Sequence, residues 1–129
     1  MSLNHSSVSV MLPIGDPDRA QKFYSEQLGL DYEGTYDEGE LCYRLSGDAQ
    51  LVLLIRPDQK PLASTAMSFE VPDLDATIAD LEGRGVAFED YDLPGLKTEN
   101  HVATQGPLRA AWFLDPDGNV LCVHEVTTP

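Results

Sequence analysis

The chain has 129 residues, with 8 Lys and Arg against 22 Asp and Glu, which gives a formal net charge of −14. Such a polyanion is repelled by nucleic acid and by anionic membrane surfaces, so we expect neither as a partner, whereas a cationic ligand would be attracted. The length suits a single domain with one core, and no apolar run is long enough to span a membrane.

The first half of the chain predicts the element order β-α-β-β-β over residues of about 7–56. Apolar and polar residues alternate over residues 7–12, which indicates a strand. A helix follows, with Asp16 as its N-cap, Pro17 at its first position and Gly29 just past its end. Residues 30–36 are strand-like, and residues 41–45 and 50–55 form a hairpin.

The same plan repeats after a turn-rich linker at residues 57–64, and the second copy covers residues of about 65–127. Ala66–Val71 reads as a strand, Asp73 caps a second helix and Gly85 closes it. About a dozen extra residues fall around Tyr91–Gly106, and the path of this long loop cannot be predicted. Loops of this length in compact domains often serve as lids or binding loops.

The stretch Trp112–Glu125 closes the second copy as a strand, a tight turn and a strand. Pro116 presets φ at the second turn position and Gly118 supplies a left-handed residue, so we interpret Asp115 and Asp117 as structural turn residues. Laying residues 41–55 over residues 110–124 without a gap gives a weaker copy of this hairpin. That alignment places Tyr43 on Trp112 and Leu53 on Cys122.

Cys42 and Cys122 lie in apolar strand patterns rather than at the spacings of a disulfide framework. Reduced cysteines, together with the absence of a basic-then-apolar N-terminal pattern, predict a cytoplasmic protein.

Three segments, Val10–Leu30, Met67–Val86 and Trp112–Glu125, resemble the vicinal-oxygen-chelate superfamily in sequence and in order. This superfamily includes glyoxalase I, extradiol dioxygenases and bleomycin-resistance proteins. The resemblance implies an α+β fold in which two βαβββ modules form a pair of half-barrels around a central cavity, within one domain over residues 4–127. It also implies a homodimer.

The resemblance places the metal ligands of the family's enzymes at Ser9, Leu53, Ala66 and Cys122. The divalent metals of these enzymes bind His, Asp and Glu side chains, and none of the four positions holds one of these residues. The Cys122 thiol is the one group among them that could bind a metal. We therefore expect no metal and no cofactor. A displaced site of His101, Cys122 and His124 is an alternative that the sequence leaves open.

Strand alternation, combined with the alignment of the two hairpins, predicts which residues face the cavity. The face is mostly apolar and carries two aromatic rings, as small-molecule pockets do. The predicted ligand-binding residues are Ser9, Met11, Tyr43, Leu53, Ala66, Ser68, Ala110, Trp112, Cys122 and His124, with Leu51 and Val120 on the same face. Trp112 and Tyr43 are expected to stack on a planar or cationic ligand from two sides.

These features predict a metal-independent protein that binds a small organic molecule, with antibiotic sequestration as the expected role. Two other interpretations remain open. One is a metal-dependent lyase or dioxygenase of glyoxalase type with an atypical metal site. The other is a non-catalytic dimerisation or regulatory module, in which the chain's own side chains fill the cavity.

Overall fold

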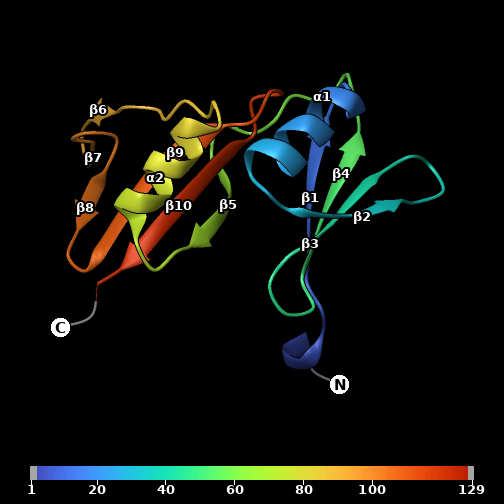
Figure 1. The fold of residues 1–129 in the computed structure, drawn as a ribbon, viewed down its shortest axis with the longest axis horizontal. Coiled ribbons are helices and arrows are strands. Elements are labelled where there is room, and N and C mark those ends of the chain that lie inside the picture. Colours follow the sequence, from blue (N-terminus) through green and yellow to red (C-terminus); the bar gives the residue numbers. More distant parts are fainter. Residues whose placement is uncertain (1–2, 128–129) are drawn as a thin grey trace. The chain divides into compact units, whose positions relative to one another are not determined.

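The computed structural model describes residues 3–127, and the chain divides into two compact units, residues 1–61 (unit 1) and 62–129 (unit 2). The boundary lies inside the predicted linker. Each unit contains one four-stranded sheet, with strand order β1-β4-β3-β2 in unit 1 and β5-β10-β9-β8 in unit 2. The predicted α+β fold of two modules is confirmed, and Figure 1 shows the elements of each.

Unit 1 follows the predicted element order. Its elements are η1 (Leu3–His5), β1 (Ser9–Ile14), α1 (Pro17–Gln21), η2 (Lys22–Gln27), β2 (Asp31–Thr35), β3 (Leu41–Arg44) and β4 (Gln50–Ile55). The carboxylate of Asp16 accepts hydrogen bonds from the backbone N–H of Asp18 at 3.0 Å and of Arg19 at 3.4 Å, as the N-cap prediction requires. The helix then continues as the π-helical turn η2, in which the N–H of Leu28 reaches back to the carbonyl of Phe23.

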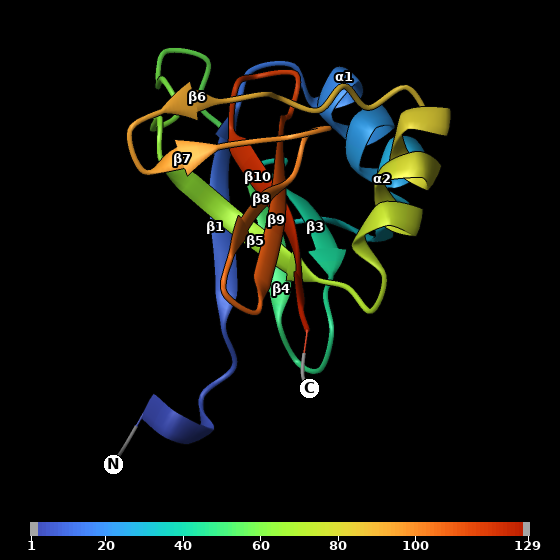
Figure 2. The same ribbon diagram turned by 90° about the vertical axis from the view of Figure 1, so that its left-hand side faces the viewer.

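Unit 2 repeats this plan with an insertion. Its elements are β5 (Thr65–Glu70), α2 (Leu74–Gly83), β6 (Asp92–Leu93), β7 (Leu96–Lys97), β8 (Ala103–Gln105), β9 (Leu108–Leu114) and β10 (Val120–Val126). The loop of unpredicted path at residues 91–106 contains the small hairpin of β6 and β7, which Figure 2 shows in a second view. It also contains β8, which pairs with β9 and forms one edge of the four-stranded sheet.

The turn between β9 and β10 is built as the sequence predicts. Asp115 is 4% exposed, and its Oδ1 accepts from the N–H of Asp117 at 2.9 Å and of Asn119 at 2.8 Å. Gly118 has φ +96°, which an L side chain rarely adopts. These contacts occupy the Asp115 carboxylate within the turn and support its structural role.

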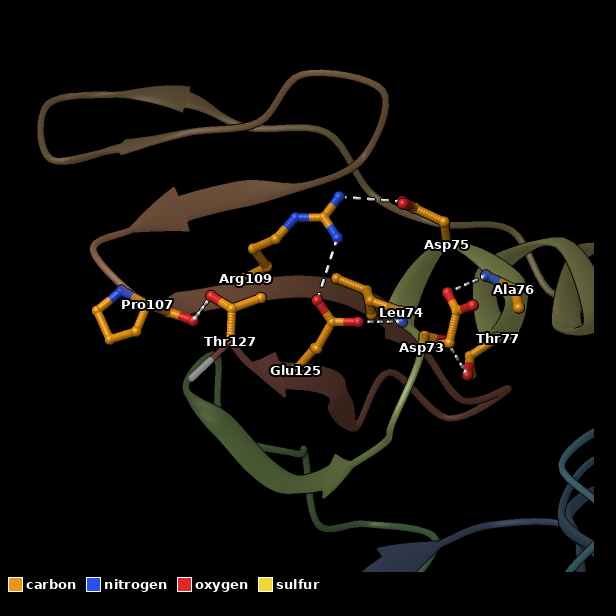
Figure 3. Close-up of polar contacts among 9 residues, drawn as sticks. All are labelled: Asp73, Leu74, Asp75, Ala76, Thr77, Pro107, Arg109, Glu125 and Thr127. Atoms are coloured by element: carbon orange, nitrogen blue, oxygen red, sulfur yellow. Dashed lines mark hydrogen bonds and ion pairs between the residues drawn. The ribbon is translucent and has the colours of Figure 1, made fainter. Parts of the chain in front are cut away.

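Helix α2 is held on its sheet by charged side chains from β9 and β10 (Figure 3). Oε1 of Glu125 accepts from the backbone N–H of Leu74 at 2.9 Å, which satisfies one of the free donors at the start of α2. Arg109 donates to Asp75 at 3.0 Å and to Glu125 at 3.4 Å. The odd-numbered residues of β9 and β10 therefore face the helix, and the even-numbered residues face away from it.

In each unit, the helix and the sheet side that faces it both contribute fully buried side chains. Tyr24, Tyr43 and Leu53 in unit 1, and Leu74 and Phe113 in unit 2, are all 0% exposed. Within residues 3–127, no helix is both long and apolar enough to cross a membrane.

Candidate ligand-binding site

The face of the unit 2 sheet that points away from α2, called here the second face, gathers most of the site residues predicted in the second half of the chain. Cys122 pairs with Ser68 on one side and with Trp112 on the other, so these three side chains form a row across β5, β10 and β9. In the adjacent row, His124 lies between Glu70 and Ala110. Ala66 is exposed and lies at an irregularity in register, between the pairs made by Thr65 and Met67.

Trp112 is the chain's only tryptophan, and its position on the second face is fixed from two directions. Its indole Nε1–H donates to Oγ1 of Thr65 at 3.0 Å, so the ring extends from β9 across β10 toward β5. Tyr91 packs on it edge to face, with ring centroids 5.7 Å apart and an interplanar angle of 83°. The indole is therefore held in place, and part of its surface remains exposed to solvent.

A series of polar side-chain contacts crosses β5 and β10 beside Trp112. Oγ of Ser68 lies 2.6 Å from Nδ1 of His124, and Nε2 of the same ring lies 3.5 Å from Oε1 of Glu70. Ser68 and Glu70 are exposed, whereas the His124 side chain is 22% exposed. The imidazole is thus oriented through both nitrogens, and the two oxygen-bearing groups remain accessible.

Cys122 is buried beneath this arrangement and is 4% exposed. Burial raises the pKa of the Cys122 thiol, and hydrogen bonds from Ser68 and from the backbone of Ala111 oppose that rise. The group consequently stays a neutral thiol at neutral pH, and a neutral thiol is not the nucleophilic form of cysteine.

The ring of His101 contacts Asp90 and Glu82 rather than Cys122 or His124. Its Nδ1 lies 3.1 Å from Asp90 and its Nε2 lies 3.5 Å from Glu82 of α2. Its backbone has φ +74° and its N–H also donates to Asp90. The structure thus does not bring together the three residues of the displaced metal site, and residues 3–127 contain no group of three or more His, Cys, Asp or Glu arranged to hold a metal.

In unit 1, the structure corrects the predicted side-chain directions of Tyr43, Leu51 and Leu53. Leu51 and Leu53 pair with Val10 and Leu12, and Tyr43 pairs with Leu51, so all of these residues point to the helix side. The Tyr43 hydroxyl lies 3.0 Å from Oγ of Ser25 and takes part in the core beneath η2. The predicted stacking of Tyr43 and Trp112 on one ligand is therefore wrong.

The error comes from a slip of one residue in aligning the two hairpins. Arg44 pairs with Gln50, and Leu114 pairs with Val120, so corresponding residues are 70 positions apart rather than 69. A shift of one residue turns every side chain of a strand to the other face. With the correct spacing Trp112 corresponds to Cys42, which lies on the other side of the unit 1 sheet.

The corrected side of the unit 1 sheet still includes Ser9 and Met11, as predicted. Met11 pairs with Val52, and Val52 pairs with Cys42. Met11 is 56% exposed, whereas Cys42 and Val52 are buried. The position that corresponds to Cys122 is accordingly Val52 rather than Leu53.

The donor set at the family's metal positions does not fit a divalent cation. After the correction these positions hold Ser9, Val52, Ala66 and Cys122. Valine and alanine have no donor atom, a serine hydroxyl is a weak ligand, and the one remaining thiol, Cys122, cannot hold a divalent cation by itself.

Three residues of the second face and its surroundings were missed in the sequence. Glu70 could have been found by continuing the strand alternation from Ser68. Thr65 could not, because the register irregularity in β5 places it next to Val120 of β10. Tyr91 belongs to the segment whose path the sequence did not determine.

A separate cavity of about 430 Å³ lies in unit 2, lined by Lys97, Glu99, Asn100, Val102, Thr104 and Arg109. Its lining is polar and mostly exposed. Its arginine is already engaged by Asp75 and Glu125, and this hydrogen bonding raises the Arg109 pKa. The cavity therefore lacks the apolar, aromatic surface that the second face offers.

The family model described as Glyoxalase/Bleomycin resistance protein/Dioxygenase superfamily matches residues 6–123. The chain belongs to this superfamily.

Individual relatives agree with that assignment. An uncharacterized protein of Bacillus subtilis, YraH, is 26% identical over 132 residues, which cover 92% of this chain and 97% of the relative. The crystal structure of TnmS3, described as an antibiotic binding protein from Streptomyces sp. CB03234, is 30% identical with a TM-score of 0.74 and covers 98% of this chain and 99% of that one. A superfamily member from Sphaerobacter thermophilus, 21% identical with a TM-score of 0.74 over 96% of this chain and 99% of that one, shares the fold.

Proposed function

We propose that the second face of the unit 2 sheet binds a small, planar organic molecule, an antibiotic being the expected class, and that binding requires no metal. The observation that carries the proposal is the fixed indole of Trp112. Its hydrogen bond to Thr65 and its contact with Tyr91 hold a flat apolar surface in place before any ligand arrives. Aromatic surfaces fixed in advance bind planar ligands at a low cost in conformational entropy.

The neighbouring residues support the same proposal. Ala110 and Cys122 lie beside Trp112 on β9 and β10, and their small, buried side chains make the sheet next to the indole apolar. Ser68, Glu70 and His124 supply polar groups at one edge, in the mixture of apolar surface and few polar groups that small-molecule sites have. The similarity to TnmS3 favours an antibiotic as the ligand.

Metal independence is supported by the donor set rather than by the family. The lyase and dioxygenase chemistry of the superfamily uses a metal as Lewis acid and template. Val52 and Ala66 stand at two of the four ligand positions, and neither carries a donor. The homodimer and the cytoplasmic location expected from the sequence stay predictions.

The test is a thermal-shift and calorimetric screen of planar aromatic antibiotics, repeated with the Trp112→Ala and Tyr32→Ala variants. Loss of the indole should weaken binding about tenfold or more, because a buried aromatic contact contributes a few kcal/mol. Tyr32 is a matched control, since it is a half-exposed aromatic that contacts Tyr43 on the helix side of the unit 1 sheet. Equal affinity in the Trp112→Ala variant would refute the proposal.

Metal dependence is tested on the same complex. Protein purified without chelator is analysed for metals, and ligand affinity is measured before and after dialysis against EDTA. We expect no stoichiometric divalent metal and unchanged affinity. A bound metal whose removal abolishes binding would refute the metal-independent part of the proposal and favour an enzyme with an atypical site.

A further inference from the structure

The second face has an apolar end and a polar end that follow one another along β5. The apolar end is the Trp112 indole, which extends from β9 across β10 to Thr65. The polar end is Ser68 and Glu70, further along the same strand. A strand rises about 3.3 Å per residue, so the Cα atoms of Thr65 and Ser68 are separated by roughly 10 Å. A ring stacked on the indole would therefore bring a short substituent within reach of the polar end.

His124 lies between the two oxygen-bearing groups of the polar end. Its Nδ1 lies 2.6 Å from Oγ of Ser68, and its Nε2 lies 3.5 Å from Oε1 of Glu70. The ring therefore holds the Ser68 hydroxyl and the Glu70 carboxylate on the same side of the sheet.

The polar end exposes a carboxylate that offers acceptors only. The Glu70 carboxylate has four acceptor positions and a side chain that is 69% exposed, so the imidazole leaves most of them available. The Ser68 hydroxyl is also exposed, and its oxygen has two lone pairs. A ligand group next to the Glu70 carboxylate has to be a hydrogen-bond donor.

We propose that Ser68, His124 and Glu70 determine specificity for planar ligands that carry an ammonium group on a short arm. The arm places the ammonium between the Ser68 oxygen and the Glu70 carboxylate, while the ring contacts Trp112. An ammonium donates three hydrogen bonds and is attracted by the net charge of −14, whereas a carboxylate would meet Glu70 as a like charge. This inference rests on the proposed function, because it places the ring on Trp112.

The test uses three probes that share one ring system: naphthalen-2-ylmethylamine, naphthalen-2-ylmethanol and 2-naphthoate. Calorimetry gives their affinities for the full chain. The indole N–H signal of the chain's one tryptophan, followed by NMR, reports ring contact separately. We expect the amine to bind roughly fivefold more tightly than the alcohol, as an exposed ion pair allows, and the naphthoate to bind more weakly than the alcohol.

Three variants assign the preference to residues. Glu70→Gln should remove the preference for the amine, and Glu70→Asp should retain part of it. Asp80→Asn is the matched control, because it removes one negative charge from the exposed side of α2, where Asp80 pairs with Arg84 at 3.3 Å. Ser68→Ala should weaken amine binding more than alcohol binding.

The outcomes separate the inference from the proposed function. Probes that shift the indole signal but bind with equal affinity, or a preference that survives Glu70→Gln, would overturn the inference and leave the aromatic site intact. A preference lost equally in Asp80→Asn would reduce it to an effect of overall charge and overturn it too. An indole signal that no probe shifts would overturn the proposed function together with the inference.

Discussion

Tyr43 illustrates what can and cannot be predicted for a single residue. Its strand is evident from the sequence, because apolar residues surround it and a turn follows. The direction of its side chain is not evident, because that direction depends on the register of the hairpin. The residues of the Ser46–Ala49 turn specify this register less clearly than the Asp115–Asn119 turn specifies that of β9 and β10. The structure buries Tyr43 completely and places its hydroxyl next to Ser25 and the carbonyl of Gln21.

Replacing Tyr43 with Phe should lower the free energy of unfolding by about 1 kcal/mol, because the buried hydroxyl loses hydrogen bonds and Ser25 loses a partner. Urea denaturation measures this change. Tyr36→Phe is the control, since the Tyr36 hydroxyl bonds Gln50 at an exposed position and its loss should cost less than half as much. Equal losses in the two variants would contradict the core role assigned to the Tyr43 hydroxyl.

Cys122 should react slowly with alkylating reagents. Its pKa lies above the ordinary value of 9.0 because burial disfavours the thiolate, so little of the reactive form exists at neutral pH. The measurement is the pH dependence of iodoacetamide modification in a Cys42→Ala background, compared with free cysteine.

Ser68→Ala should raise the apparent Cys122 pKa further, because the Ser68 hydroxyl is the main group that lowers it. An apparent pKa below that of free cysteine would show that the thiol is not desolvated in this way.

At the scale of elements, the helix starts were predictable and the hairpin register was not. Asp16 and Asp73 cap their helices through contacts within three residues, so the local sequence contains the whole signal. Register depends on pairing between strands, and an error of one position reverses every side chain. The segment 91–106 was unpredictable for a further reason, because its strands are only two or three residues long.

The connection between α2 and its sheet depends on Glu125. Its side chain, 14% exposed, accepts the first N–H of the helix and pairs with Arg109. Glu125→Ala should therefore lower the free energy of unfolding by about 1–2 kcal/mol, measured from the fluorescence of Trp112 during urea denaturation. Asp80→Ala removes an exposed pair with Arg84 and should cost less than about 0.5 kcal/mol. A smaller effect for Glu125 than for Asp80 would contradict this account.

At the scale of the molecule, the two-module fold was predictable because both halves of the sequence carry the same pattern of strands and helix caps. Asp16 and Asp73 mark the same point in each copy, and both copies proved to have the predicted order of strands. The candidate site was predictable only in its second half, where the Asp115–Asn119 turn fixes the register of β9 and β10. Thr65 and Tyr91 were not predictable, because their positions depend on the register irregularity of β5 and on the path of residues 91–106.

The thermal stability should fall in alkaline solution. Burial raises the pKa of Tyr43 and of Tyr91 above 10.0 and that of Cys122 above 9.0. Each group is neutral in the folded chain while its unfolded counterpart ionises. Its contribution is therefore complete below these ordinary values and is lost as the pH rises through the higher values of the folded chain.

Melting temperatures measured from pH 7 upward should accordingly stay level and then decline above pH 9. Tyr43→Phe should make the decline less steep, because it removes one of the groups whose pKa the folded chain raises. A decline of the same steepness in the Tyr43→Phe variant would contradict the assignment.

Within residues 3–127, every strand pairs only with strands of its own unit. Unit 1 holds strands β1, β2, β3 and β4, and unit 2 holds the remaining strands. A protease that cuts the exposed stretch around Leu62 would consequently sever the polypeptide without breaking a rung of either sheet.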